Sequence, residues 1–145
     1  MFTIPHPDKR LRWLIILTGI TLFLWLSRED NSVRSVTVFG FVVALLALSV
    51  WITGKFGGHI VRPSLLIPFA ALTGAAFGLS TALTTVALML GKSVIHSHFR
   101  PDYPPELMTA ILERIPAWSA AGALTALAFA LLWTAFHAPE PDTSA

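Results

Sequence analysis

Four long apolar blocks without a charged side chain constrain the fold of this chain more than any other feature. Every Lys, Arg, Asp, Glu and His lies outside the blocks, which cover residues 13–27, 35–54, 63–91 and 115–136. An ionised side chain at the centre of a membrane-spanning helix costs about 2.5–3.5 kcal/mol, so an inserted chain keeps its charges in the connections between helices. A soluble chain has little reason to do so. The pattern therefore predicts a multi-pass integral membrane protein.

The composition supports this class and excludes several kinds of chemistry. Hydrophobic residues make up 54% of the chain and charged residues only 12%, whereas soluble proteins carry about 25% charged residues. The net charge of +2 comes from dispersed basic residues, which argues against nucleic acid as a partner. Cysteine is absent, which excludes thiol catalysis, disulfides, iron–sulfur clusters and Cys-based zinc sites.

We expect a single all-α domain with four transmembrane helices and a mobile tail over residues 138–145. The expected spans are about 13–27, 35–54, 65–91 and 116–136. The first is short: its apolar block makes about 22 Å of helix against a hydrocarbon core of about 30 Å, so it must borrow length from its flanks. A cleaved signal peptide is the alternative for this block, but the bulky residues before Ser27 disfavour it.

Small residues predict which helices pack closely. They recur every four residues along the third and fourth blocks, where a stripe of Gly and Ala lets two helix backbones approach one another. We therefore expect the third and fourth spans to form a tight pair, although Ala and Gly are also simply common in membrane helices. The stripes consist of Ala70, Gly74, Gly78 and Ala82 in the third span and Gly122, Ala126 and Ala130 in the fourth.

Only one connection, from Lys92 to Ile115, is long and polar. Its second half, about residues 105–115, begins with a proline and an acidic residue and places its apolar residues at helical spacing. This pattern predicts a short amphipathic helix, which would most simply lie in the membrane interface plane and fold back over the bundle between the third and fourth spans.

The first half of the same connection holds the best candidates for ligand binding. His96, His98 and Asp102 offer the donors that a divalent ion such as zinc accepts, and Lys92 and Arg100 suit a lipid phosphate. Whether the histidines converge depends on where the third helix ends. If the helix unwinds near Gly91 the donors can meet, whereas if it continues Lys92 and His96 share one face. The plain alternative is that these histidines bond to headgroups or loop carbonyls.

The function that we expect is non-enzymatic and requires no cofactor. The first hypothesis is a small accessory or assembly subunit, or a homo-oligomer, that recognises a membrane protein partner through helix faces in the lipid bilayer. The second is a small transporter or channel along the Ser and Thr hydroxyls of the third span, although such hydroxyls commonly bond to their own helix. The third is a metal- or lipid-headgroup-binding protein centred on residues 92–106.

Orientation is poorly determined because five Lys and Arg residues fall on each side of the predicted topology. The cluster of Lys9, Arg10 and Arg12 precedes the first span, and such a cluster usually dominates. We therefore expect both termini to be cytoplasmic.

Overall fold

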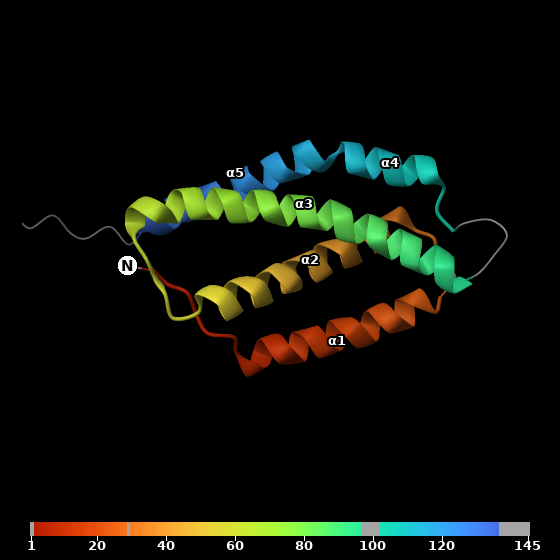
Figure 1. Cartoon of the computed structure of the whole chain (residues 1–145), viewed down its shortest axis with the longest axis horizontal. Helices are drawn as coiled ribbons and strands as arrows, with labels where there is room; N and C mark the ends of the chain where they lie inside the picture. The colour runs from red at the N-terminus through yellow and green to blue at the C-terminus, as the bar shows by residue number, and fades with distance from the viewer. Residues whose placement is uncertain (1, 29, 97–101, 137–145) are drawn as a thin grey trace, which may run out of the picture.

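The computed structural model describes residues 2–28, 30–96 and 102–136 (Figure 1). This part of the chain forms five helices, one of which is central to the others. The elements, in chain order, are β1 (Phe2–Thr3), α1 (Lys9–Leu26), α2 (Val33–Phe56), β2 (Ile60–Val61), α3 (Pro63–His96), α4 (Pro105–Glu113) and α5 (Ile115–Phe136). The all-α prediction is confirmed at this level. The tail that we expected to be mobile lies outside the described residues.

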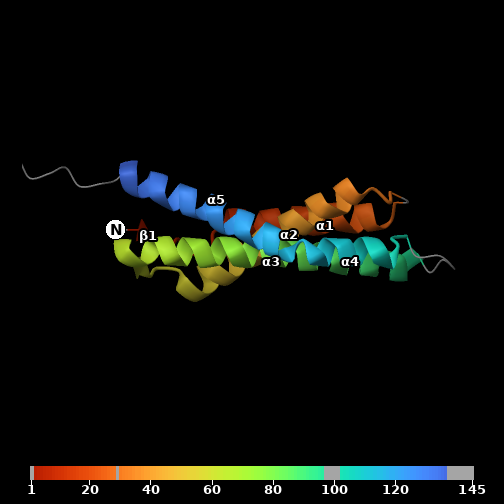
Figure 2. The same cartoon turned by 90° about the horizontal axis from the view of Figure 1, so that it is seen from above.

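The central helix is α3, with 34 residues and a length of about 51 Å. Helices α2 and α5 both pack extensively against α3 but scarcely touch one another, and α1 reaches the bundle mainly through α2. Seen from above, α5 crosses α3 and then diverges from it, while α4 follows the second half of α3 (Figure 2).

Three helices in the described part of the chain are long and apolar enough to cross a membrane: α2, the Leu65–His96 part of α3, and α5. A multi-pass membrane protein is compatible with this result. Helix α1 is not among the three. It has only 18 residues, and three of its first four carry a positive charge.

The second difference from expectation is the end of α3, which continues beyond Gly91 to His96. Gly91 is not in close contact with a neighbouring segment, because nothing lies within 4 Å of the position that a Cβ atom there would occupy. The helix therefore continues past it without a clash. The next residue, Lys92, is fully buried. Continued helical structure keeps its backbone groups hydrogen-bonded while the side chain faces inward.

The predicted amphipathic helix forms as α4, and Arg114 separates it from α5. It lies back over the bundle, along the second half of α3 (Figure 1). Ile111 is buried, and Leu107 and Met108 pack against the same core. The apolar face of α4 is thus partly covered by protein, while Leu112 stays 38% exposed.

Glycines set the distance between α3 and α5. A methyl group added at Gly74 would overlap the carbonyl oxygen of Gly122, and one added at Gly122 would overlap that of Gly74. Gly78 lies equally close to the backbone of Trp118. Among the other small residues of the two stripes, Ala82 and Ala130 are buried, Ala126 lies beside Gly74 and Ala70 is half-buried.

Two further contacts were not anticipated. Gly40 of α2 lies against Thr85 of α3, and its carbonyl accepts a hydrogen bond from the Thr84 hydroxyl at 2.9 Å. At the other end of α2, β1 pairs antiparallel with β2, which joins the N-terminus to the turn between α2 and α3. Gly58 in this turn has φ +80°, a conformation that glycine adopts without strain.

Candidate functional site: a buried polar cluster at the end of α3

A buried lysine forms the centre of a polar cluster where α1, α3 and two connections meet. The Lys92 side chain is fully buried, and its ammonium donates a hydrogen bond to the backbone carbonyl of Asp30. The same Nζ atom lies 4.2 Å from the centre of the Trp25 ring. A buried ammonium must keep a polar or aromatic partner to offset lost hydration, and here it has both kinds.

Asp30, in the turn between α1 and α2, organises the outer side of this cluster. Its carboxylate accepts hydrogen bonds from the Ser32 backbone N–H at 2.9 Å and from Trp25 Nε1 at 3.3 Å. The hydrogen bond from the Ser32 N–H, helped by Ser35, Trp25 and the charge of Lys92, holds the pKa of Asp30 below its usual value. The carboxylate is therefore ionised at neutral pH and supplies the negative charge that a buried ammonium requires.

The last residue of α3, His96, and the connection that follows it contribute the remaining members. His96 Nδ1 lies 2.5 Å from a carboxylate oxygen of Asp102. Tyr103 is buried, and its hydroxyl has no hydrogen-bond partner among the described residues. Burial, helped by the charges of Asp30 and Asp102, raises the pKa of Tyr103 to about 12. The phenol therefore stays neutral at any physiological pH.

The apolar surroundings show that the cluster is part of the core. Trp25, Met89 and Tyr103 belong to one group of buried side chains that also includes Val36, Ala82, Val86 and Ile111. Residues from α1, α2, α3, α4 and the connection before α4 thus meet at this end of the bundle. The hydrogen bonds of Lys92 and His96 hold two connections against α3, the one that follows α1 and the one that follows α3.

The predicted ligand residues are only partly brought together. His96 and Asp102 meet, whereas His98 lies outside the described residues, and no group of three metal-binding side chains occurs in the described part of the chain. Lys92 points inward, so a lipid headgroup cannot reach it in this conformation. Arg100, its proposed companion for lipid binding, lies outside the described residues.

Three of the hydroxyls proposed to line a polar path bond only to their own helix, whereas that of Thr84 also donates to Gly40 of α2. Thr73 donates to the carbonyl of Phe69 and Thr81 to that of Phe77. Thr85 likewise donates to the carbonyl of Thr81, four residues back. These groups are satisfied within α3, as such hydroxyls commonly are in membrane helices.

A second feature, a lateral groove, lies midway along the bundle between α2 and α5. It has a volume of about 490 Å³ and is open on one side. Phe77 of α3 forms part of its floor, Phe41 and Leu45 of α2 form one wall, and the opposite wall runs along α5 from Trp118 to Phe129. Four small residues lie on the α5 wall: Ala121, Gly122, Thr125 and Ala126.

Sequence reasoning missed Trp25, Asp30 and Tyr103 as members of the cluster. Trp25 lies at the end of an apolar block, a position typical of tryptophans at the membrane interface, but only 6% of it is exposed. No local spacing links residue 25 to residue 92. Gly40 did carry a signal, because it is the only glycine among the bulky residues in the first half of its block.

Compared with known family models, curated proteins and solved structures, the chain matches none.

Proposed function

We propose that α1 is a fourth membrane span, so that the chain crosses the bilayer four times with both termini on one side. The support is the pairing of β1 with β2, which holds the start of the chain beside the turn between α2 and α3. At its other end, α1 brings Trp25 to Lys92, near the end of α3. The segment from β1 to the end of α1 therefore covers the same distance as α2, and if α2 crosses a membrane this segment crosses with it.

The surface of α1 supports the same proposal. Of its large apolar side chains, Leu17 is 58% exposed, Ile20 54% and Phe23 70%, and only Trp25 is buried. Such a surface needs lipid or protein around it rather than water. Its three basic residues all lie in the first turn, where their side chains reach the headgroup region.

For the molecule as a whole, we propose a non-enzymatic role as a small accessory or assembly subunit, or as a homo-oligomer, that binds a transmembrane helix. The observation that carries this proposal is the lateral groove. It extends along α5 over about 16 Å, so a second helix can lie in it along about half of the hydrocarbon core.

The groove has the composition that a helix partner requires. Ala121 and Thr125, and likewise Gly122 and Ala126, are four residues apart on the α5 wall, and small residues at this spacing let a second backbone approach. The aromatic rings of Phe41 and Phe129 border the groove. The charged groups of the cluster, by contrast, are engaged, Lys92 with the carbonyl of Asp30 and Asp102 with His96. We therefore assign recognition to the lateral surface.

Photo-crosslinking inside the membrane tests this proposal. A benzophenone amino acid replaces Leu45, which lines the groove and is 45% exposed. The matched control replaces Leu72, which is 72% exposed on α3 and does not line the groove. We expect a protein adduct of one defined mass from position 45 only, lost when Ala121 is replaced by Trp. Lipid adducts alone from both positions would contradict the proposal.

A second function has one observation in its favour, the contact between His96 and Asp102. Because the carboxylate engages Nδ1, a metal would have to bind Nε2, and Asp102 would then orient the imidazole rather than coordinate the ion. Metal analysis of the purified protein tests this function. Wild type should hold metal that His96→Ala and His98→Ala lose, and equal near-zero content in all three would reject the metal site.

A further inference from the structure

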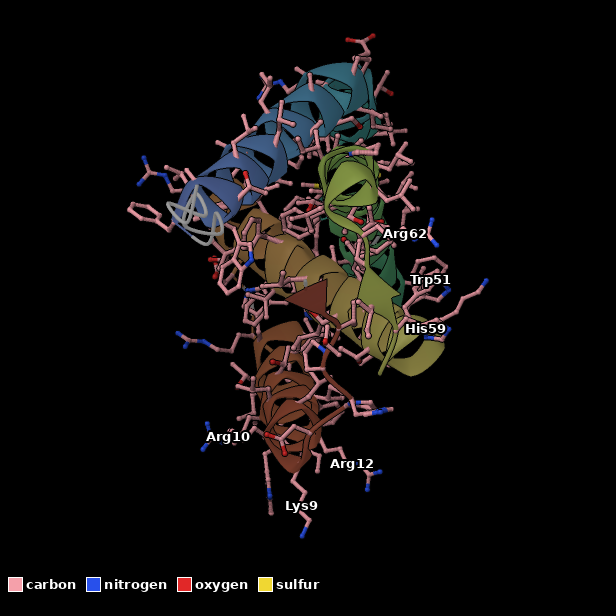
Figure 3. All side chains as sticks on the ribbon, turned by 90° about the vertical axis from the view of Figure 1, so that its left-hand side faces the viewer. Lys9, Arg10, Arg12, Trp51, His59 and Arg62 are labelled. Atoms are coloured by element: carbon pink, nitrogen blue, oxygen red, sulfur yellow. The ribbon has the colours of Figure 1, made fainter. Side chains whose placement is uncertain are left out.

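The end of the bundle opposite the polar cluster carries most of the exposed positive charge. Lys9, Arg10 and Arg12 begin α1, Lys55 lies at the end of α2, and Arg62 directly precedes α3. We call these five residues the basic end. All five are exposed, and the labelled members Lys9, Arg10, Arg12 and Arg62 point outward around the rim of the bundle (Figure 3).

Strand pairing brings these separate segments together. Phe2 pairs with Val61 and Thr3 with Ile60, and the Ile4 N–H donates to the carbonyl of His59 at 3.1 Å. Strand β1, which shortly precedes α1, is thereby fixed beside the residues that directly precede Arg62. The basic end thus consists of residues from three separate segments of the chain rather than one continuous run of basic residues.

Few acidic groups offset this charge. Asp8 is the only acidic residue at this end in the part of the chain that the structure describes, and it lies 4.0 Å from Arg10. In the rest of the described chain the charges balance: the basic residues are Arg28, Arg34, Lys92 and Arg114, and the acidic residues are Asp30, Asp102, Glu106 and Glu113. Of these basic residues, Lys92 is buried.

Tryptophans mark the level of the membrane surface at the same end. Trp13 is 64% exposed, Trp51 54% and Trp133 46%, and each lies about one turn from the end of its helix. The ammonium of Lys55 lies 5.4 Å from the Trp51 ring centre. Exposed tryptophans just inside a rim of Lys and Arg are typical of the headgroup region of a bilayer. The remaining two tryptophans do not belong to this end. Trp25 lies in the buried core and Trp118 packs against that core.

We propose that the basic end binds the headgroups of anionic phospholipids and that this end therefore faces the anionic, cytoplasmic leaflet. Phosphate oxygens accept hydrogen bonds from the Lys and Arg side chains, while the tryptophans fix their depth. The inference rests on the proposed four-span topology, because Lys9, Arg10 and Arg12 reach this leaflet only if α1 crosses the membrane.

Lipid titration of the full chain by native mass spectrometry tests the inference, with phosphatidylglycerol as the anionic probe and phosphatidylcholine as the neutral one. A basic residue near an anionic surface contributes about fivefold to binding. We expect wild type to bind phosphatidylglycerol at least tenfold more tightly than phosphatidylcholine. Lys9→Gln/Arg10→Gln/Arg12→Gln should reduce this preference at least tenfold, and Lys55→Gln/Arg62→Gln should also reduce it.

The matched control is Arg28→Gln/Arg34→Gln, which removes two exposed charges from the opposite end and should change the preference less than twofold. Equal binding of the two lipids by wild type would overturn the inference, as would an equal loss in the control or a loss below twofold in the triple variant. Helix topology is measured separately, by the cysteine labelling described below. Failure of lipid selectivity is therefore distinguishable from failure of the four-span proposal.

Discussion

The two ends of this bundle use lysine in opposite ways. At one end Lys92 is buried against Trp25 and held by the carbonyl of Asp30, inside the main core. At the other end Lys55 is exposed beside Trp51, among four other basic residues. In both places an ammonium lies over an indole ring. Only at the second can it reach a lipid phosphate.

This difference explains why a count of Lys and Arg on each side of the predicted topology gave no bias. The count treats every positive charge as available to lipid, but the charge of Lys92 is satisfied inside the protein. Once Lys92 is set aside, five exposed basic residues lie at the basic end and three, Arg28, Arg34 and Arg114, are exposed in the rest of the described chain. The polar cluster stabilises the fold, and the basic end presents charge to the surroundings.

The largest effect that tests this comparison is expected from Lys92→Met. The substitution removes the ammonium but keeps most of the stem, so the Asp30 carbonyl loses its buried donor and Trp25 loses its cation. We expect a loss of about 2–3 kcal/mol in the free energy of unfolding, measured by denaturant titration in mixed micelles. The matched variant Lys55→Met should change it by less than about 0.5 kcal/mol. Equal effects at the two positions would abolish the distinction between the ends.

A smaller effect is expected from Gly58→Ala, which tests how the basic end is assembled. Gly58 has φ +80°, where a Cβ atom costs about 1–2 kcal/mol. The substitution should lower the free energy of unfolding by about that amount and weaken selectivity for anionic lipid, because the turn holds β1 in place. Gly54→Ala is the control: nothing lies within 4 Å of its added methyl, and alanine favours helix. If the two variants unfold alike, the turn does not organise this end.

The smallest effect concerns Tyr103 and reports on burial at the cluster end. Tyr103 is the only tyrosine in the chain, so tyrosinate absorbance measures it directly. We expect ionisation near pH 12 rather than near 10. Because the folded state holds the phenolic proton more tightly than the unfolded state, the resulting stability is complete below pH 10 and is lost as the pH rises toward 12. A midpoint near 10 would mean that Tyr103 is solvated and that this end is open.

Much of the fold follows from the sequence because charge segregation and helical spacing are local signals. The apolar blocks locate α2, α3 and α5, and the small-residue pattern includes Gly74 and Gly122, which lie together in the structure. The candidate site was only partly anticipated. Lys92, His96 and Asp102 were singled out, but the partners of Lys92 come from residues 25 and 30, and contacts at such separations leave no periodic trace. The course of α4 depends on the core that forms beneath it, which a single helix cannot reveal.

Single-cysteine labelling tests the central claim, that α1 and α2 cross the membrane together. The chain has no native cysteine, so His6→Cys, Ser32→Cys and His59→Cys each introduce one exposed thiol. A membrane-impermeant maleimide is applied to sealed vesicles of known orientation. We predict that positions 6 and 59 react from the same side and position 32 from the opposite side. Reaction of positions 6 and 32 from one side, with position 59 on the other, would contradict the account because α1 would then not span the membrane.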